Sequence, residues 1–395
     1  MAFDTASLPL SYKTAQGRLR SSLLTAGPVR DAIVTEARQL GHHFKEAIVQ
    51  EGGHGSSWRL TSDEGAALNG TDLAPTPLAY FNAGLQADLA GRVGSVLRER
   101  GMPVASFGAG FSARYALTGS FTEGSGQGFA ESVGGHIAFE CDLPDADLAA
   151  AVRDAVARSP ALRLVETPVE NTFALYCNGR RRHAPRLPVS NKQVSKLPTP
   201  TDPFLKYSRP PAPLEETATA AVLGERITKT GHKTPGTAAP PPAPGQRATW
   251  SVNGEGMFDV AGGIYRCKTA LDRPGSSQFA FVTDETGADR APCGLTLLSG
   301  AIAFCYMTQL ARYIDAMKLD VDGVRLVQTS PYEIEVGSRG IAGPCDTHLF
   351  LNGTADVQVF EQLQQIAANT CYLHQTMTAA TPLKVTAANR GHRIL

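Results

Sequence analysis

The sequence predicts an α+β protein built from two similar halves, each with an antiparallel-rich sheet, a long central helix and a second helix. Three observations support this. The chain has 395 residues, 42% of them apolar, which is more than one ordinary core holds. A segment rich in Pro, Thr and Ala, residues 190–247, has the composition of a linker and separates residues 1–189 from residues 248–395. Both parts carry the same order of strands, long helix, strands and last helix.

The composition narrows the class of protein. Lys plus Arg and Asp plus Glu both number 37, so no net charge attracts the chain to nucleic acid or to an anionic membrane, and we expect neither as a partner. We see no signal peptide and no run that approaches eighteen apolar residues, which predicts a cytoplasmic protein. Seven cysteines without framework spacing indicate free thiols rather than a disulfide scaffold.

Alternating apolar residues, together with prolines and glycines that interrupt strands, predict the strands of the second half. In "SSQFAFVTDE", residues 276–285, apolar positions alternate as in a strand that is buried mainly on one side. Residues 323–355 indicate further strands, broken by Pro331, Gly337 and Gly340.

Two helices follow from the pattern of apolar residues. The stretch 295–318 lacks proline and is apolar on all faces, as in a helix buried at the centre of a molecule. Its small residues near Gly300 predict the close approach of another backbone. A more amphipathic last helix is expected over "VFEQLQQIAANTCYLHQTM", after Asp356, and a short one at "LEETATAAVLGE" within the linker. The long helix carries Cys305 and the last one carries Cys371.

The two halves align with each other segment by segment. When 291–321 is laid on 74–104 without gaps, the Ala-Pro start, the helix length and the final Val coincide, and Asp88 falls opposite Cys305. Ser159 falls opposite Cys371. Three further pairs keep the same order: "VTDE" with "TSDE", "YRCKTAL" with "FKEAIVQ", and "HLFLNG" with "HIAFEC". Shared order across these segments predicts an internal duplication.

These segments resemble the OsmC/Ohr superfamily of thiol peroxidases. The resemblance is carried by "APCGLTLLSGAIAFCYMTQL" and "IAANTCYLHQTM", with "APTPLAYFNAGLQADL" and "AVARSPALRL" as a degenerate copy in which Ser159 stands where the family commonly has cysteine. Family members form interlocked homodimers around two long helices. The resemblance therefore implies an intramolecular pseudo-dimer, with 1–189 degenerate and 248–395 carrying the cysteine pair.

The resemblance also implies a chemistry. Cys305 would be the peroxidatic thiol and Cys371 the resolving thiol in the reduction of organic hydroperoxides, regenerated by a small dithiol or lipoyl-type reductant and without a bound cofactor. The family pairs a Glu before the first cysteine with an Arg from the amino-terminal strands. Here the Glu position holds Thr296 or Leu295, and we take Arg266 as the candidate cation, with Lys45 as its counterpart in the first half.

Other polar residues have two interpretations each. His374 follows Cys371 by three residues and is either a base toward that thiol or a histidine bound to nearby backbone. Cys293 is either a thiolate at the start of the long helix or a turn residue. We expect no metal site, because CxxC and HxxxH spacings are absent, and we interpret His42 and His43 as solvated residues.

Two other functions remain open. Cys305 could instead be the nucleophile of a hydrolase or of a specialised metabolic enzyme that acts on a small apolar substrate. In a non-catalytic ligand-binding protein, both cysteines would only pack. A further homo-oligomer is compatible with all three functions.

Overall fold

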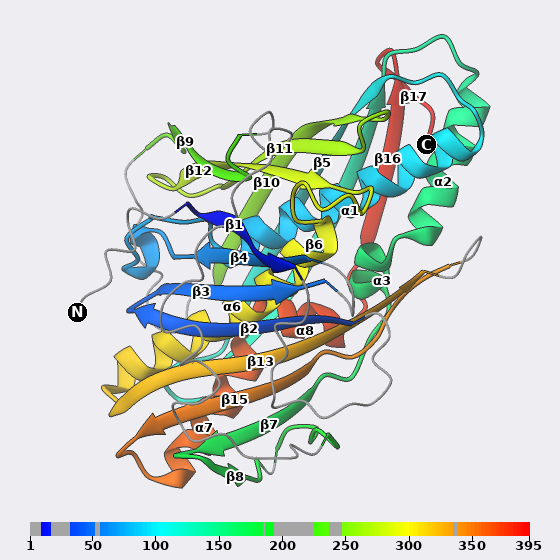
Figure 1. The fold of residues 1–395 in the computed structure, drawn as a ribbon. Helices are drawn as coiled ribbons and strands as arrows, with labels where there is room; N and C mark the ends of the chain where they lie inside the picture. The colour runs from blue at the N-terminus through cyan, green and yellow to red at the C-terminus, as the bar shows by residue number, and fades with distance from the viewer. Residues whose placement is uncertain are drawn as a thin grey trace.

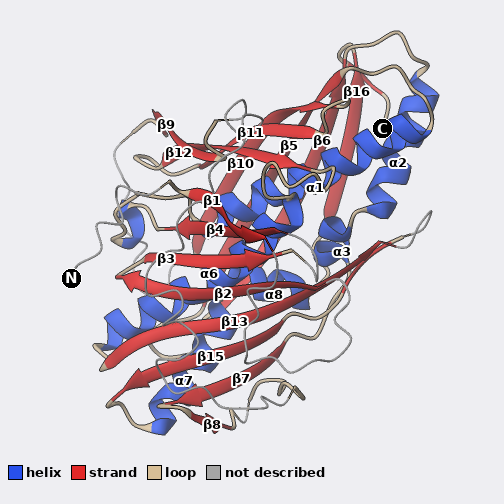
Figure 2. Cartoon of the chain, viewed as in Figure 1, coloured by secondary structure: helices blue, strands red, loops and turns tan. Residues whose placement is uncertain are grey.

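The computed structural model describes residues 9–16, 32–51, 56–184, 186–192, 224–236, 247–334 and 339–395. Within these residues the chain forms two large sheets with helices packed between and beside them (Figure 2). The prediction of a mixed α and β class is therefore confirmed.

Nine strands make sheet A: β1 (Ser11–Gln16), β2 (Ala32–Gly41), β3 (Phe44–Gln50), β4 (Ser56–Ser62), β7 (Thr172–Cys177), β8 (Arg180–Arg182), β13 (Val321–Ile334), β14 (Gly340–Ala342) and β15 (Asp346–Gly353). Their order is β1-β4-β3-β2-β13-β15-β7-β8, with β14 paired to β13. β13 continues through Pro331, contrary to the predicted break there. Proline lacks a backbone donor, and the position is tolerated because the pairing of β13 with β2 ends at Pro331. Gly337 lies outside the described residues.

Eight strands make sheet B: β5 (Ser106–Thr118), β6 (Gln127–Phe139), β9 (Ile227–Lys233), β10 (Ala248–Asp259), β11 (Ile264–Leu271), β12 (Ser277–Asp284), β16 (Leu383–Asn389) and β17 (His392–Arg393). Read from β9, their order is β9-β12-β11-β10-β5-β6-β16-β17, which matches the order of sheet A strand for strand. Each sheet joins strands from before and after the predicted linker: β2 pairs with β13, and β10 pairs with β5.

The helices are α1 (Pro77–Glu99), α2 (Asp145–Arg158), α3 (Pro160–Glu166), α6 (Gly294–Met317), α7 (Val357–Thr370) and α8 (Tyr372–Thr378), with a short 3₁₀ turn, η2 (Ala66–Leu68). α6 packs on β2, β3 and β13 of sheet A, α1 packs on β5, β10 and β11 of sheet B, and the two helices pack on each other. Figure 1 shows both lying between the two sheets.

The two central helices form where the sequence predicts. α1 begins with the Thr76 side chain accepting from the Ala79 backbone N–H and with Pro77 in the first turn, both favourable at a helix start. Every residue of α6 from Gly294 to Ala311 is buried, as the apolar pattern predicts. α6 is long and apolar enough by composition to cross a membrane, but 94% of its most apolar window is buried inside the protein.

The close contact between α1 and α6 depends on Gly84 and Gly294 rather than on the residues near Gly300. A Cβ on Gly84 would lie 2.7 Å from the Gly294 carbonyl oxygen, and one on Gly294 would lie 2.6 Å from the Asp88 backbone nitrogen. Gly300 instead faces Leu60 of sheet A. The small-residue pattern therefore identifies a packed helix correctly but misplaces its closest contact.

The last helical segments of the two halves have matching bounds. α2 and α7 each have 14 residues, α3 and α8 each have seven, and one residue separates the members of each pair. That residue is Ser159 in the first half and Cys371 in the second. The single helix predicted across Cys371 is thus two helices. Pro160 explains the break after Ser159, because proline disfavours helical geometry in the residue before it, whereas Tyr372 gives no such signal.

Part of the predicted linker is a strand. β9, within residues 190–247, pairs with β12 and holds the place in sheet B that β1 holds in sheet A. The helix expected over 214–225 lies outside the described residues except for its last two positions.

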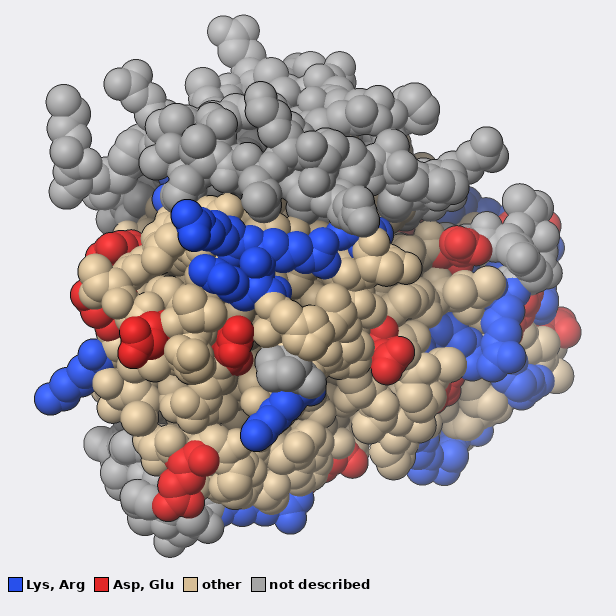
Figure 3. Space-filling view, turned by 90° about the horizontal axis from the view of Figure 1, so that it is seen from below, with Lys and Arg blue, Asp and Glu red and all other residues tan. Residues whose placement is uncertain are grey.

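On the face drawn in Figure 3, basic and acidic side chains are both present among wide areas of uncharged surface.

Candidate functional site

The structure brings the side chains of Cys305 and Cys371 together in the core. Cys305 lies in the middle of α6 and is 2% exposed, and Cys371 lies between α7 and α8 and is 0% exposed. Burial raises the pKa of the Cys371 thiol well above its usual value, and its hydrogen-bonding contact with Cys305 raises it further. A cysteine of α6 and the cysteine between α7 and α8 therefore form one buried pair, which we call the thiol site.

A buried lysine supplies positive charge at the thiol site. Lys45, on β3, is 2% exposed, and Cys305 is close enough to interact with its charge. Burial lowers the pKa of Lys45, and the carboxylate of Glu64 acts in the opposite direction. A cation beside a thiol favours its ionised form, which is the nucleophile.

Lys45 is held by a short chain of polar groups. Its Nζ donates to the Thr308 hydroxyl at 2.8 Å and to the His43 carbonyl oxygen at 3.0 Å, and it lies 3.8 Å from Glu64 Oε1. The Thr308 hydroxyl donates to Glu64 Oε1 at 2.6 Å. Thr308 follows Cys305 by one helical turn, so α6 presents both side chains on the same side. Glu64 is itself buried, and this burial raises its pKa against the effect of Lys45.

Arg266 does not contribute to the thiol site. It is exposed on β11, whereas its neighbour Tyr265 is fully buried, so the two side chains point to opposite faces of sheet B. The alignment of "YRCKTAL" with "FKEAIVQ" is displaced by one residue. Lys45 pairs with Ser62 on β4, and Tyr265 pairs with Thr283 at the same place on β12. Tyr265 is therefore the counterpart of Lys45, and the prediction of Arg266 as the cation is wrong.

His374 contacts the second cysteine. Its Nδ1 lies 3.2 Å from Cys371 Sγ, and its Nε2 lies 3.4 Å from the Thr347 hydroxyl. Burial lowers the pKa of His374 to about 3, so the ring is neutral near pH 7. A ring with so low a pKa is a weak base, so His374 can accept a hydrogen bond from the Cys371 thiol but does not hold its proton near pH 7.

Tyr115 presents an unpaired hydroxyl beside Cys305. It lies on β5, is fully buried, and its hydroxyl has no hydrogen-bond partner among the described residues. Burial raises the pKa of Tyr115, and Cys305 adds to that effect, which places the two groups near each other. A buried hydroxyl without a partner costs about 1–3 kcal/mol, so Tyr115 is a hydrogen-bond donor that the described residues leave unused.

Cys293 lies apart from the thiol pair. It is the residue that precedes α6, but the carboxylates of Glu51 and Glu285 reinforce the effect of burial and raise the pKa of its thiol well above the usual value. The thiolate expected from the helix start is thus disfavoured. The Thr296 hydroxyl, where the resemblance expects a carboxylate, donates to Glu51.

His348 lies apart from His374 and Cys371. His348 lies on β15 beside Asp346, with 3.2 Å between its Nε2 and Asp346 Oδ2, while the adjacent Thr347 is the residue that contacts His374. Successive residues of a strand point to opposite faces, so His348 does not join Cys371 and His374.

His43 is not a solvated residue. It is 3% exposed at the hairpin between β2 and β3, while His42 beside it is exposed and pairs with Asp315 at the end of α6. Burial, aided by the charge of Lys45, lowers the pKa of His43 to about 3. The interpretation of the pair as solvated therefore holds for His42 and is wrong for His43.

The equivalent place in the first half contains a carboxylate instead of a thiol. The Ser159 hydroxyl donates to Asp88 Oδ2 at 2.5 Å, and the Ala161 backbone N–H donates to the same oxygen at 3.3 Å. Arg92 donates to Asp88 Oδ1 at 2.9 Å from the next turn of α1. Both Asp88 oxygens are thus paired, and we call this group the Asp88 site.

Comparisons with known proteins give one similar structure. It is the crystal structure of an OsmC-like hydroperoxide resistance protein from Jannaschia sp. CCS1, at 21% identity and a TM-score of 0.24, covering 33% of this chain and 89% of that chain. A similarity of this size does not assign the chain to a family. No protein-family profile and no curated protein matches the sequence.

Proposed function

We propose that this protein is a thiol-dependent peroxidase that reduces organic hydroperoxides with Cys305 and Cys371. The observation that carries the proposal is the contact between the two cysteines in a core that also holds Lys45 next to Cys305. A peroxidatic thiol requires a nearby cation and a second thiol within reach, and these two features come from three separate segments of the chain.

The first step uses Cys305. Its thiolate attacks the terminal oxygen of the hydroperoxide, an S–O bond forms, the O–O bond breaks, and the alkoxide leaves as an alcohol after taking a proton. The Lys45 ammonium stabilises the thiolate, and Thr308 and Glu64 hold that ammonium in place. In this scheme the unpaired Tyr115 hydroxyl donates a hydrogen bond to a peroxide oxygen.

The second step uses Cys371. Its sulfur attacks the sulfenic acid of Cys305, the S–S bond forms as the S–O bond breaks, and the Cys371 proton leaves with the hydroxyl group as water. His374 orients the Cys371 thiol through their contact. A dithiol or lipoyl-type reductant then takes the disulfide back to two thiols and is itself oxidised. In this scheme the Lys45–Glu64 pair does the work that the resemblance assigns to an Arg–Glu pair.

We also propose that the fold is an intramolecular pseudo-dimer produced by duplication. The identical strand order of the two sheets and the matching bounds of α2 with α7 and of α3 with α8 support this. Sheet A would then combine β1–β4, β7 and β8 of the first half with β13–β15 of the second, and α6 of the second half packs on this shared sheet. Lys45, from the first half, would thereby complete the site of the second.

The test is peptide mass mapping after one equivalent of cumene hydroperoxide, with thiol loss followed in time. We expect a rapid and nearly exclusive disulfide between Cys305 and Cys371. Cys305→Ser should abolish peroxide reduction, and Cys371→Ser should stop after one turnover with a sulfenic acid that dimedone traps. Cys177→Ser, a buried cysteine elsewhere in sheet A, is the matched control and should behave as wild type. Slow oxidation spread over all cysteines would contradict the proposal.

A non-catalytic binding protein is the second candidate, and the burial of both thiols favours it. In that case the cysteines would only pack, and the Cys371 thiol would stay protonated because of its raised pKa. Equal, slow reaction of Cys305 and Cys177 with the hydroperoxide would support this candidate over the peroxidase.

A further inference from the structure

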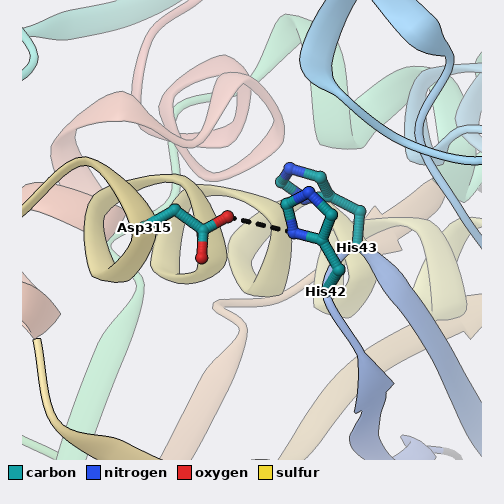
Figure 4. A group of neighbouring side chains, drawn as sticks. All are labelled: His42, His43 and Asp315. Atoms are coloured by element: carbon teal, nitrogen blue, oxygen red, sulfur yellow. Dashed lines mark ion pairs between the residues drawn. The ribbon is translucent and has the colours of Figure 1, made fainter. Parts of the chain in front are cut away.

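We propose that His42, His43 and Asp315 form a binding site for a divalent metal ion of the zinc class. Their ligand atoms all lie within 4.8 Å of one another (Figure 4). Two imidazoles and one carboxylate are a ligand set that Zn²⁺ and Co²⁺ accept, with a fourth position left for water. The site lies outside the thiol site and does not depend on the proposed peroxidase activity.

The fold positions the three side chains from two elements. His42 and His43 are the two turn residues between β2 and β3, and Asp315 is in the last turn of α6. His42 has a φ of 43°, in the left-handed region that few residues other than Gly, Asn and Asp adopt readily. The His42 ring lies beside Asp315, with 3.0 Å between Nδ1 and Oδ2. A hairpin and a helix end thus hold two ligands at nearly the spacing that one metal ion requires.

His43 carries the strongest sign of a ligand. Its Nδ1 is buried and has no hydrogen-bond partner among the described residues, while its ring contacts the Leu68 carbonyl. A histidine that binds a metal through one nitrogen usually donates its other N–H to a carbonyl or carboxylate. The Leu68 contact fits that arrangement and leaves the Nδ1 lone pair available. The His43 ring lies 4.4 Å from the His42 ring between centroids, so both can turn toward one ion.

The charges around His42, His43 and Asp315 should give this site a moderate affinity for a metal ion. Lys45 and Arg312 are the cations that act on His43, and both oppose a metal ion. Lys45 is paired with Glu64, and the Arg312 guanidinium is stacked over Phe121. Asp315 supplies the negative charge at the site itself. We therefore expect weaker binding than at a zinc site closed by four protein ligands.

The test is titration of tag-free, EDTA-treated full-length protein with Co²⁺, followed by visible absorption, and with Zn²⁺ by calorimetry. We expect one ion per chain and no sulfur-to-cobalt charge-transfer band, because no cysteine takes part. His42→Asn, in which asparagine accepts the left-handed backbone, and Asp315→Asn should each weaken binding by at least about tenfold. Both positions are exposed, so these variants should fold.

The matched control is His232→Asn, an exposed histidine on β9, which should bind as the wild type does. Absence of saturable binding by the wild-type protein would overturn the proposal. Unchanged binding by both site variants, or a charge-transfer band that shows thiolate ligation, would overturn it as well.

Discussion

At the thiol site two cysteines face each other beside a buried lysine, whereas at the Asp88 site a carboxylate binds a serine hydroxyl and an arginine. The two places are equivalent in the strand order and helix bounds of the fold. The Asp88 site satisfies both carboxylate oxygens internally. The thiol site retains an unpaired Tyr115 hydroxyl and a buried ion pair, Lys45 with Glu64. Groups that stay unsatisfied at a stability cost are the ones available to a ligand. In the proposed function the thiol site is therefore the reactive one and the Asp88 site a structural one.

The largest expected effect concerns the stability that Asp88 provides. Asp88→Asn leaves the Arg92 guanidinium without its partner, and breaking a buried ion pair costs about 3 kcal/mol, the low end of the usual range because Arg92 is partly exposed. Chemical denaturation measures this loss. The paired variant is Cys305→Ala at the equivalent position, which removes only a small side chain and should cost about 1 kcal/mol. Equal losses at the two positions would remove the distinction between the sites.

Glu285 interacts with Asp88 and Arg92, and it should make the stability of the protein depend on pH. Burial raises the pKa of Glu285 to about 7, Asp88 adds to this, and Arg92 opposes it. Because the folded-state pKa lies above the unfolded value near 4.5, the contribution of Glu285 to stability is complete below pH 4.5 and declines as pH rises through 7. Glu285→Gln should remove this dependence, which amounts to about 2 kcal/mol after allowance for partial exposure.

Thermal unfolding at pH 5 and pH 8 checks this prediction. The difference between Glu285→Gln and wild type should favour the variant at pH 8 and shrink at pH 5. Glu123→Gln, an exposed glutamate, is the control and should follow wild type at both values. A variant that is destabilised more at pH 8 than at pH 5 would show that Glu285 is ionised and paired in the folded protein.

The sequence predicts which residues pair at the two sites, but not which strand residue lies beside Cys305, and the difference has a physical cause. The gapless alignment of 291–321 with 74–104 sets Asp88 opposite Cys305, and the order of the later segments sets Ser159 opposite Cys371. In the structure Asp88 contacts Ser159, and Cys305 contacts Cys371. Helix positions could be aligned because length and caps fix them. The strands could not be aligned in the same way, because an error of one residue moves every side chain to the opposite face of the sheet. Such an error led to the choice of the exposed Arg266 instead of the buried Tyr265.

Other contacts were beyond sequence reasoning because they join distant segments. Thr308 lies one turn after Cys305 and could have been noticed on a helical projection. Its contact with Lys45 and Glu64 depends on the docking of β3 and the end of β4 against α6, which no local pattern encodes. The burial of His43 has the same origin, because "HH" in a hairpin is normally exposed and only the tertiary fold covers it.

Lys45 is the residue that most distinguishes the two sites, because its counterpart in the other half is Tyr265. Lys45→Met alone would leave Glu64 buried without a cation, so the double variant Lys45→Met/Glu64→Gln preserves the charge balance of the core. Loss of the cation should slow the reaction of Cys305 with hydroperoxide at pH 7 by at least about tenfold.

The measurement is the rate of Cys305 modification by hydroperoxide and by iodoacetamide as a function of pH. In the double variant both profiles should move to higher pH, because less thiolate is present at each value, whereas a purely structural role for Lys45 would lower the rates without moving the midpoint. Arg266→Gln is the matched control, since that exposed guanidinium points away from α1, and it should leave both profiles unchanged. An unshifted midpoint in the double variant would assign the activation of Cys305 to other groups and reduce the contrast between the two sites to the thiols alone.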